Sequence, residues 1–309
     1  MWKQVKSSTC IRIGYGKVAQ MHDSILRGLG ISTIGIIEAD EEKEKLARNR
    51  GIRVFSCYEE AAEQNPQIWD VCVDTGAHID VLRQIITIVP HANILMEKPL
   101  CYASELGKVD RLLSNFTGKI TIGENYASSN LLSLIIQKLY PTHIPESISI
   151  EFVKDRRQDM SNGRFTDKEF GVLGYEGSHM LEVVCQVARC WTIKEIHAKQ
   201  QDTHTHASEF SLENGIRVQF ATSTCSAASK ESARKVTIGA KEPIIGTFDC
   251  QTHDYISKLL YAGSEYYFTD NSMRNHLSRA LQYFEGKAEN PYTWKSASNI
   301  VKLLQSLSQ

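Results

Sequence analysis

The order of apolar and polar residues divides the chain into two parts. Up to about residue 120, short apolar runs alternate with stretches of helical spacing. The runs are strand candidates and lie at residues 10–14, 32–38, 53–56, 70–75 and 93–97. One of the helical stretches, residues 39–51, is highly charged and ends at a glycine. Strands that alternate with helices predict a parallel sheet with crossover helices, which is an α/β architecture.

The second part has the pattern of an α+β domain. A helical stretch at residues 131–140 precedes strand candidates at residues 147–155, 192–201, 206–215, 216–225, 235–241 and 246–252. Asn214-Gly215 is a strong hairpin signal between two of them, and the chain ends in two helical stretches. We therefore expect domains at residues 1–122 and 123–309. The second should hold a largely antiparallel, open sheet, with its last helices packing back on the first domain.

Composition and charge exclude several classes of function. The 309 residues carry a net charge of -1, so no basic surface for nucleic acid is expected. The apolar stretch at residues 131–140 is interrupted by Gln137 and Lys138, far short of a membrane span. The first ten residues lack the apolar core of a signal peptide. Eight cysteines form no C-x-x-C pair, which favours reduced thiols in a cytoplasmic protein.

A glycine-rich signature follows the first strand candidate. In a dinucleotide-binding turn, glycines let the backbone tighten and approach a pyrophosphate, which lies at the N-terminus of the next helix. Strand, loop and helix come here in the required order, with Ala19 at the third glycine position. A plain glycine turn is the alternative. The motif predicts cofactor-binding positions at Gly14, Tyr15, Gly16, Lys17 and Val18.

An acidic residue ends the second strand candidate. Glu38 lies about 20 residues after the glycine loop, where a carboxylate accepts hydrogen bonds from the adenosine ribose. A carboxylate repels a 2′-phosphate, and Ala39 and Asp40 follow instead of an arginine. These residues favour NAD over NADP. A solvated helix cap is the alternative role, and it suits Asp40 better than Glu38.

A lysine between a glutamate and a proline ends the last strand candidate of the first part. Glu97-Lys98-Pro99, the glycine loop and the antiparallel second part together resemble the Gfo/Idh/MocA oxidoreductases, such as glucose-fructose oxidoreductase and inositol dehydrogenase. The resemblance implies that Lys98 hydrogen-bonds the reacting hydroxyl or carbonyl beside the nicotinamide, and that the chain before Pro99 presents it, through a cis peptide. An ammonium stabilises the negative charge that hydride transfer builds on oxygen. An ion pair between Lys98 and Glu97 is the alternative.

The resemblance also implies a histidine motif in the second part, with an aspartate four residues before the histidine. Here His179 matches the histidine, while Tyr175 takes the aspartate position. Histidine accepts protons near neutral pH, so His179 is the predicted base. Tyr175 is predicted to be a donor or orienter, because a phenol supports a charged imidazolium much less than a carboxylate does. A helix-start histidine bonded to the backbone is the alternative.

Further positions are predicted to contact ligands. Thr75 and Gly76 stand where the family usually shows Thr-Pro, and with Glu97 they are expected to line the cofactor. Substrate contacts are expected from Asn125, Tyr126, Arg156, Asn162 and Arg164. For the loop residues Arg156, Asn162 and Arg164, a solvated side chain is the alternative. His204 and His206 alternate on a strand without an evident third ligand, so a surface strand and no metal site are expected.

The predicted function is that of an NAD-dependent oxidoreductase. It would interconvert a secondary alcohol and a ketone on a sugar, amino sugar or cyclitol, and redox-assisted elimination or epimerisation is a close variant. A non-catalytic dinucleotide-binding sensor and an imine or tetrapyrrole reductase stay open as alternatives. Because an open sheet needs covering, a homodimer or homotetramer is expected.

Overall fold

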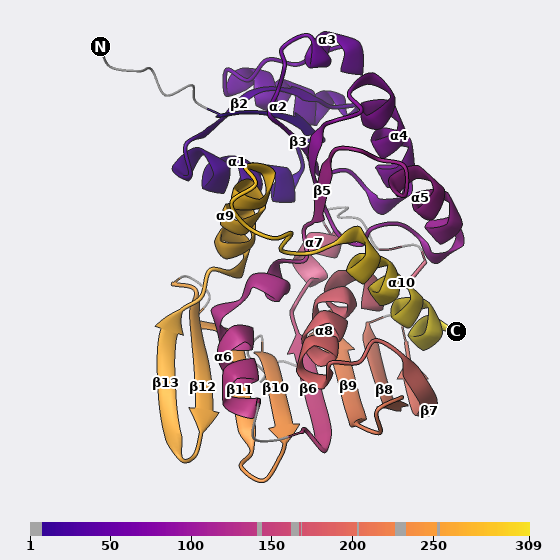
Figure 1. Ribbon diagram of the computed structural model, residues 1–309, viewed down its shortest axis with the longest axis vertical. Coiled ribbons are helices and arrows are strands. Elements are labelled where there is room, and N and C mark those ends of the chain that lie inside the picture. Colours follow the sequence, from indigo (N-terminus) through magenta and orange to yellow (C-terminus); the bar gives the residue numbers. More distant parts are fainter. Residues whose placement is uncertain are drawn as a thin grey trace. The chain divides into compact units, whose positions relative to one another are not determined.

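The computed structural model describes residues 8–140, 144–161, 167, 169–202, 204–225, 233–251 and 254–309. This part of the chain forms two compact units (Figure 1). The first unit contains the residues up to Gly123 and the segment Leu277–Ser298, and the second contains Glu124–His276 and Asn299–Gln309. No helix within the described ranges is both long and apolar enough to cross a membrane.

The first unit is built on a parallel sheet, as predicted, and this sheet has five strands. Its strands are β1 (Ser8–Ile13), β2 (Ile31–Ile37), β3 (Ile68–Val71), β4 (Asn93–Met96) and β5 (Lys119–Ile122), in the order β2-β1-β3-β4-β5. Its helices are α1 (Lys17–Gly28), α2 (Glu41–Asn49), α3 (Tyr58–Ala62), α4 (His78–Ile88) and α5 (Leu106–Leu113), with 3-10 turns η1 (Thr75–Ala77) and η2 (Ala103–Glu105). Two helices, α9 (Ser272–Phe284) and α10 (Trp294–Ser308), contribute residues to both units.

Continuous burial of the central strands shows that both faces of this sheet are covered. All four residues of β3 and residues 10–13 of β1 are buried, as is typical of a parallel sheet between helices. The register pairs Arg12 of β1 with Asp70 of β3. Both are fully buried, and Nε of Arg12 lies 2.7 Å from Oδ2 of Asp70. A charge inside an apolar strand is thus matched by the neighbouring strand.

The third strand candidate, residues 53–56, is reduced to a single bridge. Val54 pairs in parallel with Ile36 of β2, with hydrogen bonds from Ile36 N to Arg53 O and from Phe55 N to Ile36 O, both 2.8 Å. With this bridge counted as an edge strand, the strand order is the usual 3-2-1-4-5-6 order of a dinucleotide-binding sheet.

The second unit is built on an eight-stranded sheet. Its strands are β6 (Ser147–Val153), β7 (Ile193–Gln201), β8 (Thr205–Leu212), β9 (Arg217–Ser223), β10 (Ala233–Gly239), β11 (Ile244–Gln251), β12 (Ile256–Tyr261) and β13 (Ser264–Thr269). The order is β13-β12-β11-β10-β6-β9-β8-β7, and the neighbours are antiparallel except for the parallel pair β6 and β9. The largely antiparallel, open sheet is therefore confirmed.

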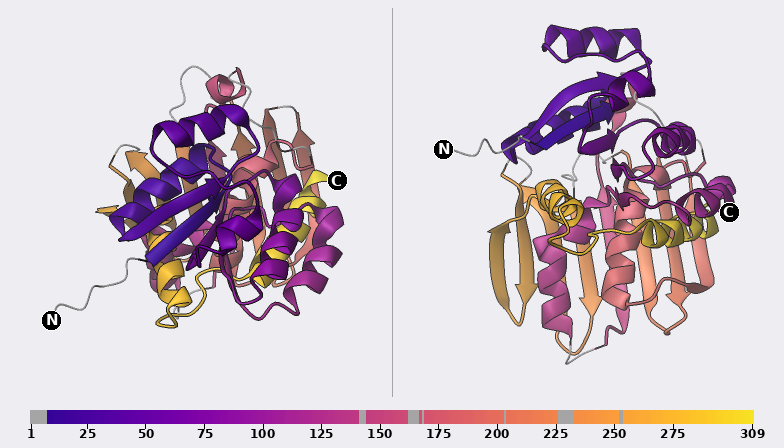
Figure 2. Two further views of the ribbon diagram at one scale, coloured as in Figure 1. Left: turned by 90° about the horizontal axis from the view of Figure 1, so that it is seen from above. Right: turned by 45° about the horizontal axis from the view of Figure 1, so that its top comes forward.

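Helices cover one face of this sheet. The 3-10 turn η3 (Asn125–Ser128) leads into α6 (Asn130–Leu139), and α7 (Arg157–Ser161) precedes α8 (Leu173–Ala188). In Figures 1 and 2, α6 and α8 lie on the same side of the strands. In β8, every second residue from His206 to Leu212 is buried, so this strand has one face toward the core.

Two sequence expectations need correction here. The strands β12 and β13 were not among the candidates; they form a hairpin around Ala262 and Gly263, both at positive φ, and Ala-Gly is a weaker turn signal than Asn-Gly. His206 does not lie on a surface strand. It is 1% exposed, and its ring bonds to Gln201 and Ser208. Burial lowers the pKa of His206 to about 4, so the ring is neutral near pH 7.

Candidate active site

The glycine loop between β1 and α1 fits a pyrophosphate. Gly14 has a φ of +86°, and a Cβ on it would lie 2.6 Å from the carbonyl oxygen of Cys72. Gly16 is the N-cap residue of α1, and a Cβ on it would meet nothing within 4 Å. Gly16 makes no side-chain capping hydrogen bond to α1. The loop therefore combines a tight turn with open space in front of a helix N-terminus, which favours an anion.

Alanine at the two glycines should have opposite effects. Gly14→Ala is expected to destabilise the fold by about 1–3 kcal/mol, because it forces a left-handed residue against the Cys72 carbonyl. Gly16→Ala should leave the unfolding free energy within about 0.5 kcal/mol. It should nevertheless weaken NAD binding, because its Cβ fills the space before α1. Thermal unfolding measures the change in stability, and calorimetric titration measures the NAD affinity. Equal unfolding curves for the two variants would contradict the different roles given to Gly14 and Gly16.

Glu38 is hydrogen-bonded to the same loop. Its Oε2 accepts a hydrogen bond from the Tyr15 amide at 2.6 Å, and its Oε1 accepts from Ala39 and Asp40 at 2.8 and 3.0 Å. Asp40, not Glu38, caps α2, through the amides of Glu42 and Lys43. Glu38 thus lies beside the glycine loop at the end of β2, as the ribose role requires.

The Tyr15 side chain belongs to the core. It is fully buried in a cluster with Ala19, Ile36, Ala47 and Ile52, and its hydroxyl accepts a hydrogen bond from Arg50 at 3.2 Å. The ring therefore supports the loop from inside, and it is the main chain at this position that could contact a cofactor. Lys17 is exposed and Val18 half-buried on the first turn of α1.

Lys98 follows the carboxyl end of β4. In a parallel sheet the carboxyl ends of the strands share one edge, so the residues after β1, β2, β3 and β4 gather there. The amide of Glu97 donates to the Val71 carbonyl at 2.9 Å, which continues the pairing beyond β4. The Lys98-Pro99 peptide bond is cis, as the resemblance implies.

The loop after β3 is tied to the segment after Pro99. Thr75 is 5% exposed at the start of η1, and a Cβ on Gly76 would lie 3.4 Å from the Tyr102 ring. The ring of His78 is buried, with Nε2 3.1 Å from the Val73 carbonyl and Nδ1 3.3 Å from the Leu100 carbonyl. Burial lowers the pKa of His78. This histidine, which was not predicted as a site residue, connects the two loops expected to line the cofactor.

Six residues of the first unit form a row of alternating charges, which we call the charge chain. The contacts are Glu97 Oε1 to His22 Nε2 at 3.3 Å, His22 Nδ1 to Asp70 at 3.0 Å, Asp70 to Arg12 at 2.7 Å, Arg12 to Asp23 at 3.2 Å, and Asp23 to Arg27 at 2.7 Å. Burial disfavours charge here, yet Asp70 raises the pKa of His22 well above its ordinary value. Likewise, despite burial, His22 and Arg12 hold the pKa of Asp70 far below its usual range. The outer member, Arg27, is 71% exposed.

Part of this chain has the composition of a metal site. His22, Asp70 and Cys72 offer three potential ligand atoms within 4.8 Å of one another. The Arg12 guanidinium already pairs with Asp70, however, and burial raises the pKa of the Cys72 thiol to about 12. A cation here would face a guanidinium and a protonated thiol, so the geometry favours a hydrogen-bonded cluster.

In the second unit, the candidate base His179 has a carboxylate partner. Its Nδ1 hydrogen-bonds to Oε1 of Glu124, which follows β5 and is 1% exposed. The sequence analysis expects Tyr175 in place of the usual carboxylate near this histidine, and the structure adds a carboxylate, Glu124, that the sequence analysis did not predict. Because a carboxylate accepts, Nδ1 is the donor, and Nε2 of the neutral ring carries the lone pair. The contact joins residues 55 apart, and no motif spacing signals it.

Aromatic rings support His179. The Tyr126 ring lies 4.9 Å from the His179 ring, and it packs against Phe152 at 5.5 Å and Phe248 at 5.1 Å between ring centroids. Tyr126 is 3% exposed, and its hydroxyl donates to Asp249 at 3.3 Å. Burial raises the pKa of Tyr126, so this phenol stays protonated. Its position fits support of the histidine better than direct contact with substrate.

Two arginines near this histidine are paired with carboxylates. Arg156 lies 2.7 Å from Glu176, and Arg234 pairs with Asp249 and lies 3.8 Å from Glu176. Although burial would raise it, the pKa of Glu176 is held far below its usual range by Arg234, His179 and Arg156. Arg156, predicted to bind substrate, is thus engaged in a largely buried ion pair, and its guanidinium lies 5.8 Å from the centre of the Tyr175 ring.

The remaining predicted substrate contacts are only partly described. Asn125 donates from Nδ2 to Ser272 at 3.2 Å. Its Oδ1 is buried and has no hydrogen-bond partner among the described residues. The hydroxyl of Ser178, the residue before His179, is likewise buried without such a partner. Asn162 and Arg164 lie outside the described residues.

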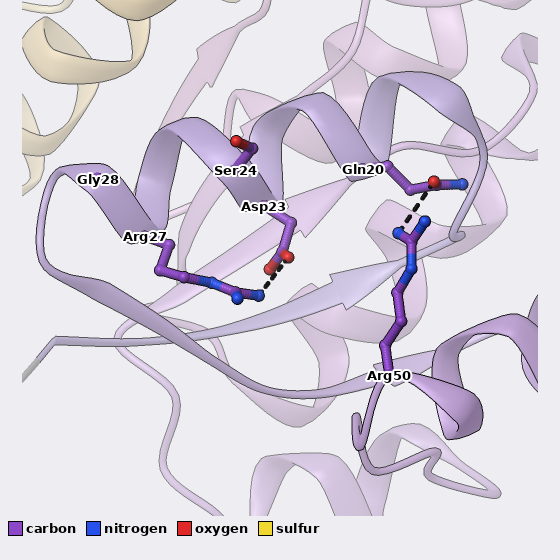
Figure 3. Close-up of a pocket in the computed structure, with 6 residues that line it drawn as sticks. All are labelled: Gln20, Asp23, Ser24, Arg27, Gly28 and Arg50. Atoms are coloured by element: carbon purple, nitrogen blue, oxygen red, sulfur yellow. Dashed lines mark hydrogen bonds and ion pairs between the residues drawn. The ribbon is translucent and has the colours of Figure 1, made fainter.

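A surface hollow of about 640 Å³ lies elsewhere, along α1 (Figure 3). Arg27 bonds to Asp23 and Arg50 bonds to Gln20 across its wall. It is lined by Gln20, Asp23, Ser24, Arg27, Gly28 and Arg50. None of the predicted cofactor residues lines it, so it is not the cofactor site.

The fold and the glycine loop define a class of protein, those with a dinucleotide-binding Rossmann domain. Residues 9–117 match the family model GFO_IDH_MocA, described as an oxidoreductase family with an NAD-binding Rossmann fold. The resemblance to the Gfo/Idh/MocA oxidoreductases inferred from the sequence is thus confirmed over this segment. No curated protein sequence matches the chain.

Solved structures share the fold over almost the whole chain. UDP-N-acetylglucosamine 3-dehydrogenase from Acidithiobacillus ferrooxidans has a TM-score of 0.78 at 13% identity, covering 97% of this chain and 96% of its own. An oxidoreductase from Thermotoga maritima has a TM-score of 0.81 at 16% identity, covering 98% and 96%. The dehydrogenase WlbA from Thermus thermophilus, in complex with NAD and UDP-GlcNAcA, has a TM-score of 0.73 at 13% identity, covering 98% and 95%. At these identities the similarity shows the fold.

Proposed function

We propose that this protein interconverts a secondary alcohol and a ketone on a polyhydroxylated small molecule, such as a sugar, amino sugar or cyclitol, with NAD as hydride carrier. The observation that carries the proposal is the hydrogen bond between His179 and the buried Glu124. A histidine that donates from Nδ1 to a carboxylate keeps Nε2 as proton acceptor, which oxidation of a hydroxyl requires.

Each residue has a defined part in the proposed reaction. In the oxidation direction, Nε2 of His179 accepts the hydroxyl proton as the O–H bond breaks, and Glu124 stabilises the resulting imidazolium. Lys98 stabilises the negative charge on the reacting oxygen. The NAD nicotinamide supplies the acceptor for the hydride that leaves the same carbon. In the reverse direction His179 returns the proton.

The charges around His179 favour a substrate that is uncharged near the reacting carbon. Arg156 and Arg234 face Glu176 and Asp249, so two cations are matched by two carboxylates. A substrate carboxylate that bound Arg156 or Arg234 would have to displace one of these partners, at the cost of leaving it buried without that cation. Hydroxyl groups need no such exchange, which favours a polyol or sugar at the reacting carbon.

Turnover of a substrate panel tests the proposal. The full-length protein is incubated with NAD and hexoses, amino sugars, inositols or UDP-N-acetylhexosamines, and NADH is followed by absorbance. The UDP-sugars are included because two structurally similar proteins act on or bind such compounds. We expect oxidation of at least one uncharged polyol or sugar moiety.

The alternatives predict other outcomes of the same panel. A non-catalytic sensor would bind NAD with no turnover of any compound. An imine or tetrapyrrole reductase would oxidise NADH only with those acceptors. Either result would overturn the proposal.

Cofactor choice is expected to depend on Glu38. Glu38→Ala should weaken NAD binding about tenfold, because the ribose loses a charge-assisted hydrogen bond. The variant should also reduce the difference in affinity between NAD and NADP. Asp40→Ala is the matched control: it removes the cap of α2 and should lower stability by about 1 kcal/mol without changing the NAD to NADP ratio. A wild type that binds NADP more tightly than NAD would refute the assignment.

We also propose that the protein forms a homodimer or homotetramer through the second unit. Its sheet has α6 and α8 on one face, and the edge strands β7 and β13 are largely exposed. An open sheet of this kind is commonly covered by a partner. Sedimentation of the purified protein measures its mass, and a monomer at micromolar concentration would contradict the proposal.

A further inference from the structure

The main chain of the glycine loop is held by side chains from outside the loop. The N–H of Tyr15 donates to Glu38 at 2.6 Å, and the Tyr15 carbonyl oxygen accepts a hydrogen bond from Nε2 of Gln20 at 3.2 Å. Gln20 lies at the beginning of α1. Both polar groups of the Tyr15 main chain are therefore fixed, one by the end of β2 and the other by the flank of α1.

A second side chain holds Gln20 in place. Nη1 of Arg50, the residue at the C-terminal end of α2, donates to Oε1 of Gln20 at 3.0 Å and to the Tyr15 hydroxyl at 3.2 Å. Figure 3 shows the bond between Gln20 and Arg50. A guanidinium only donates and a carbonyl oxygen only accepts, so the Gln20 amide must turn its oxygen to Arg50 and its NH2 group to the loop.

The direction of the Tyr15 carbonyl determines the direction of the next amide. The peptide bond between Tyr15 and Gly16 is trans, so its carbonyl and its N–H point in opposite directions. With the carbonyl turned toward Gln20, the N–H of Gly16 points away from this flank of α1. It has no acceptor among the residues that the structure describes, and a Cβ on Gly16 would meet nothing within 4 Å. A free main-chain donor beside open space at a helix N-terminus suits a pyrophosphate oxygen.

We propose that Gln20 is a positioning residue for the cofactor: it holds the Tyr15 carbonyl, is itself held by Arg50, and thereby aims the N–H of Gly16 at the pyrophosphate of NAD. The inference rests on the proposed use of NAD, but it concerns binding alone, so it is measurable without a substrate. It also gives a role to the end of the hollow along α1 that Gln20 and Arg50 line.

Binding of cofactor fragments to the full-length protein tests the inference. Calorimetric titration measures the affinities for NAD and ADP, which carry a pyrophosphate, and ligand-observed NMR measures that for adenosine, which carries none. Gln20→Met keeps the length of the side chain but removes both hydrogen bonds. The affinities for NAD and ADP should fall about tenfold, because the Gly16 N–H is no longer held toward a charged acceptor. The affinity for adenosine should stay within about twofold of the wild type, because Glu38 remains in place.

Steady-state kinetics separate positioning from a part in the chemistry. With the best compound of the substrate panel, Gln20→Met should raise the KM for NAD about tenfold. The value of kcat at saturating NAD should stay within about twofold of the wild type, because the lost interaction acts on the pyrophosphate in the ground state and the transition state alike.

Variants at neighbouring positions provide the controls. Ser24 is exposed one turn further along α1, on the wall of the same hollow, and Ser24→Ala should bind all three ligands as the wild type does. Arg50→Met removes the support of Gln20 but leaves its NH2 group, so the affinities for NAD and ADP should fall about threefold. The double variant Gln20→Met/Arg50→Met should lose less than the product of the two single losses, because Arg50 acts through Gln20.

An unchanged ADP affinity in Gln20→Met would overturn the inference. An adenosine affinity that falls as far as the ADP affinity would also overturn it, because this result would show a general loosening of the loop. If the pattern of fragment binding holds while no compound of the substrate panel is turned over, the proposed function fails and the positioning role stands.

Discussion

Replacement of Lys98 by methionine is expected to reduce kcat by about a thousandfold or more. Methionine retains the length and apolar stem of lysine but lacks the ammonium that stabilises charge on the reacting oxygen. NAD affinity should change by less than about threefold, because the pyrophosphate is held by the glycine loop and not by this side chain. Steady-state kinetics with the best compound of the panel, together with calorimetric titration of NAD, measure the two quantities.

Lys45→Met is the control for this variant, since Lys45 is exposed on α2 and has no part in the proposed reaction. It should retain wild-type kcat. A near-normal kcat in Lys98→Met would return Lys98 to the role of an ion-pair partner and remove it from the chemistry.

The second large effect is expected at Glu124. Glu124→Gln keeps the shape of the side chain but replaces the carboxylate that accepts from Nδ1 of His179. The imidazolium formed during oxidation loses its counter-charge, and kcat should fall about a hundredfold. In His179→Asn, kcat should fall by at least the same factor. Because the two residues act as one unit, the double variant should be no slower than His179→Asn alone.

Glu209→Gln is the matched control, because Glu209 is an exposed carboxylate on β8 in the same unit. It should have wild-type kinetics. Additive losses in the Glu124/His179 double variant would show that the carboxylate does not act through the histidine.

Contiguous motifs carried most of the prediction from sequence. Gly14 and Gly16 lie in one loop, and Lys98 lies at the end of an apolar run, so their order along the chain already indicates their place at the edge of a parallel sheet. The Glu124 to His179 contact was missed for the opposite reason. Its two residues come from different motifs, and Tyr175 occupies the position where the family pattern would have pointed to a carboxylate.

The pairing of the buried charged side chains was also not predicted from the sequence. Arg12 within an apolar strand signals that a partner exists, because an unpaired guanidinium in a core is strongly unfavourable. Nothing in the spacing says that the partner is Asp70, and still less that His22 and Glu97 complete the row. These contacts depend on strand register and on the packing of α1, which a single sequence does not specify.

The charge chain also limits how this domain can change during evolution or engineering. Loss of Asp70 would remove the nearest counter-charge of both Arg12 and His22 in the core, so an allowed path must replace inner members in pairs, such as Arg12 together with Asp70. Aligned relatives should therefore show these positions covarying. The inward face of α1 offers little freedom to a designer who wishes to alter nucleotide preference. The end of β2, where the Glu38 carboxylate bonds to the main-chain amides of Tyr15, Ala39 and Asp40, is the more permissive place to start.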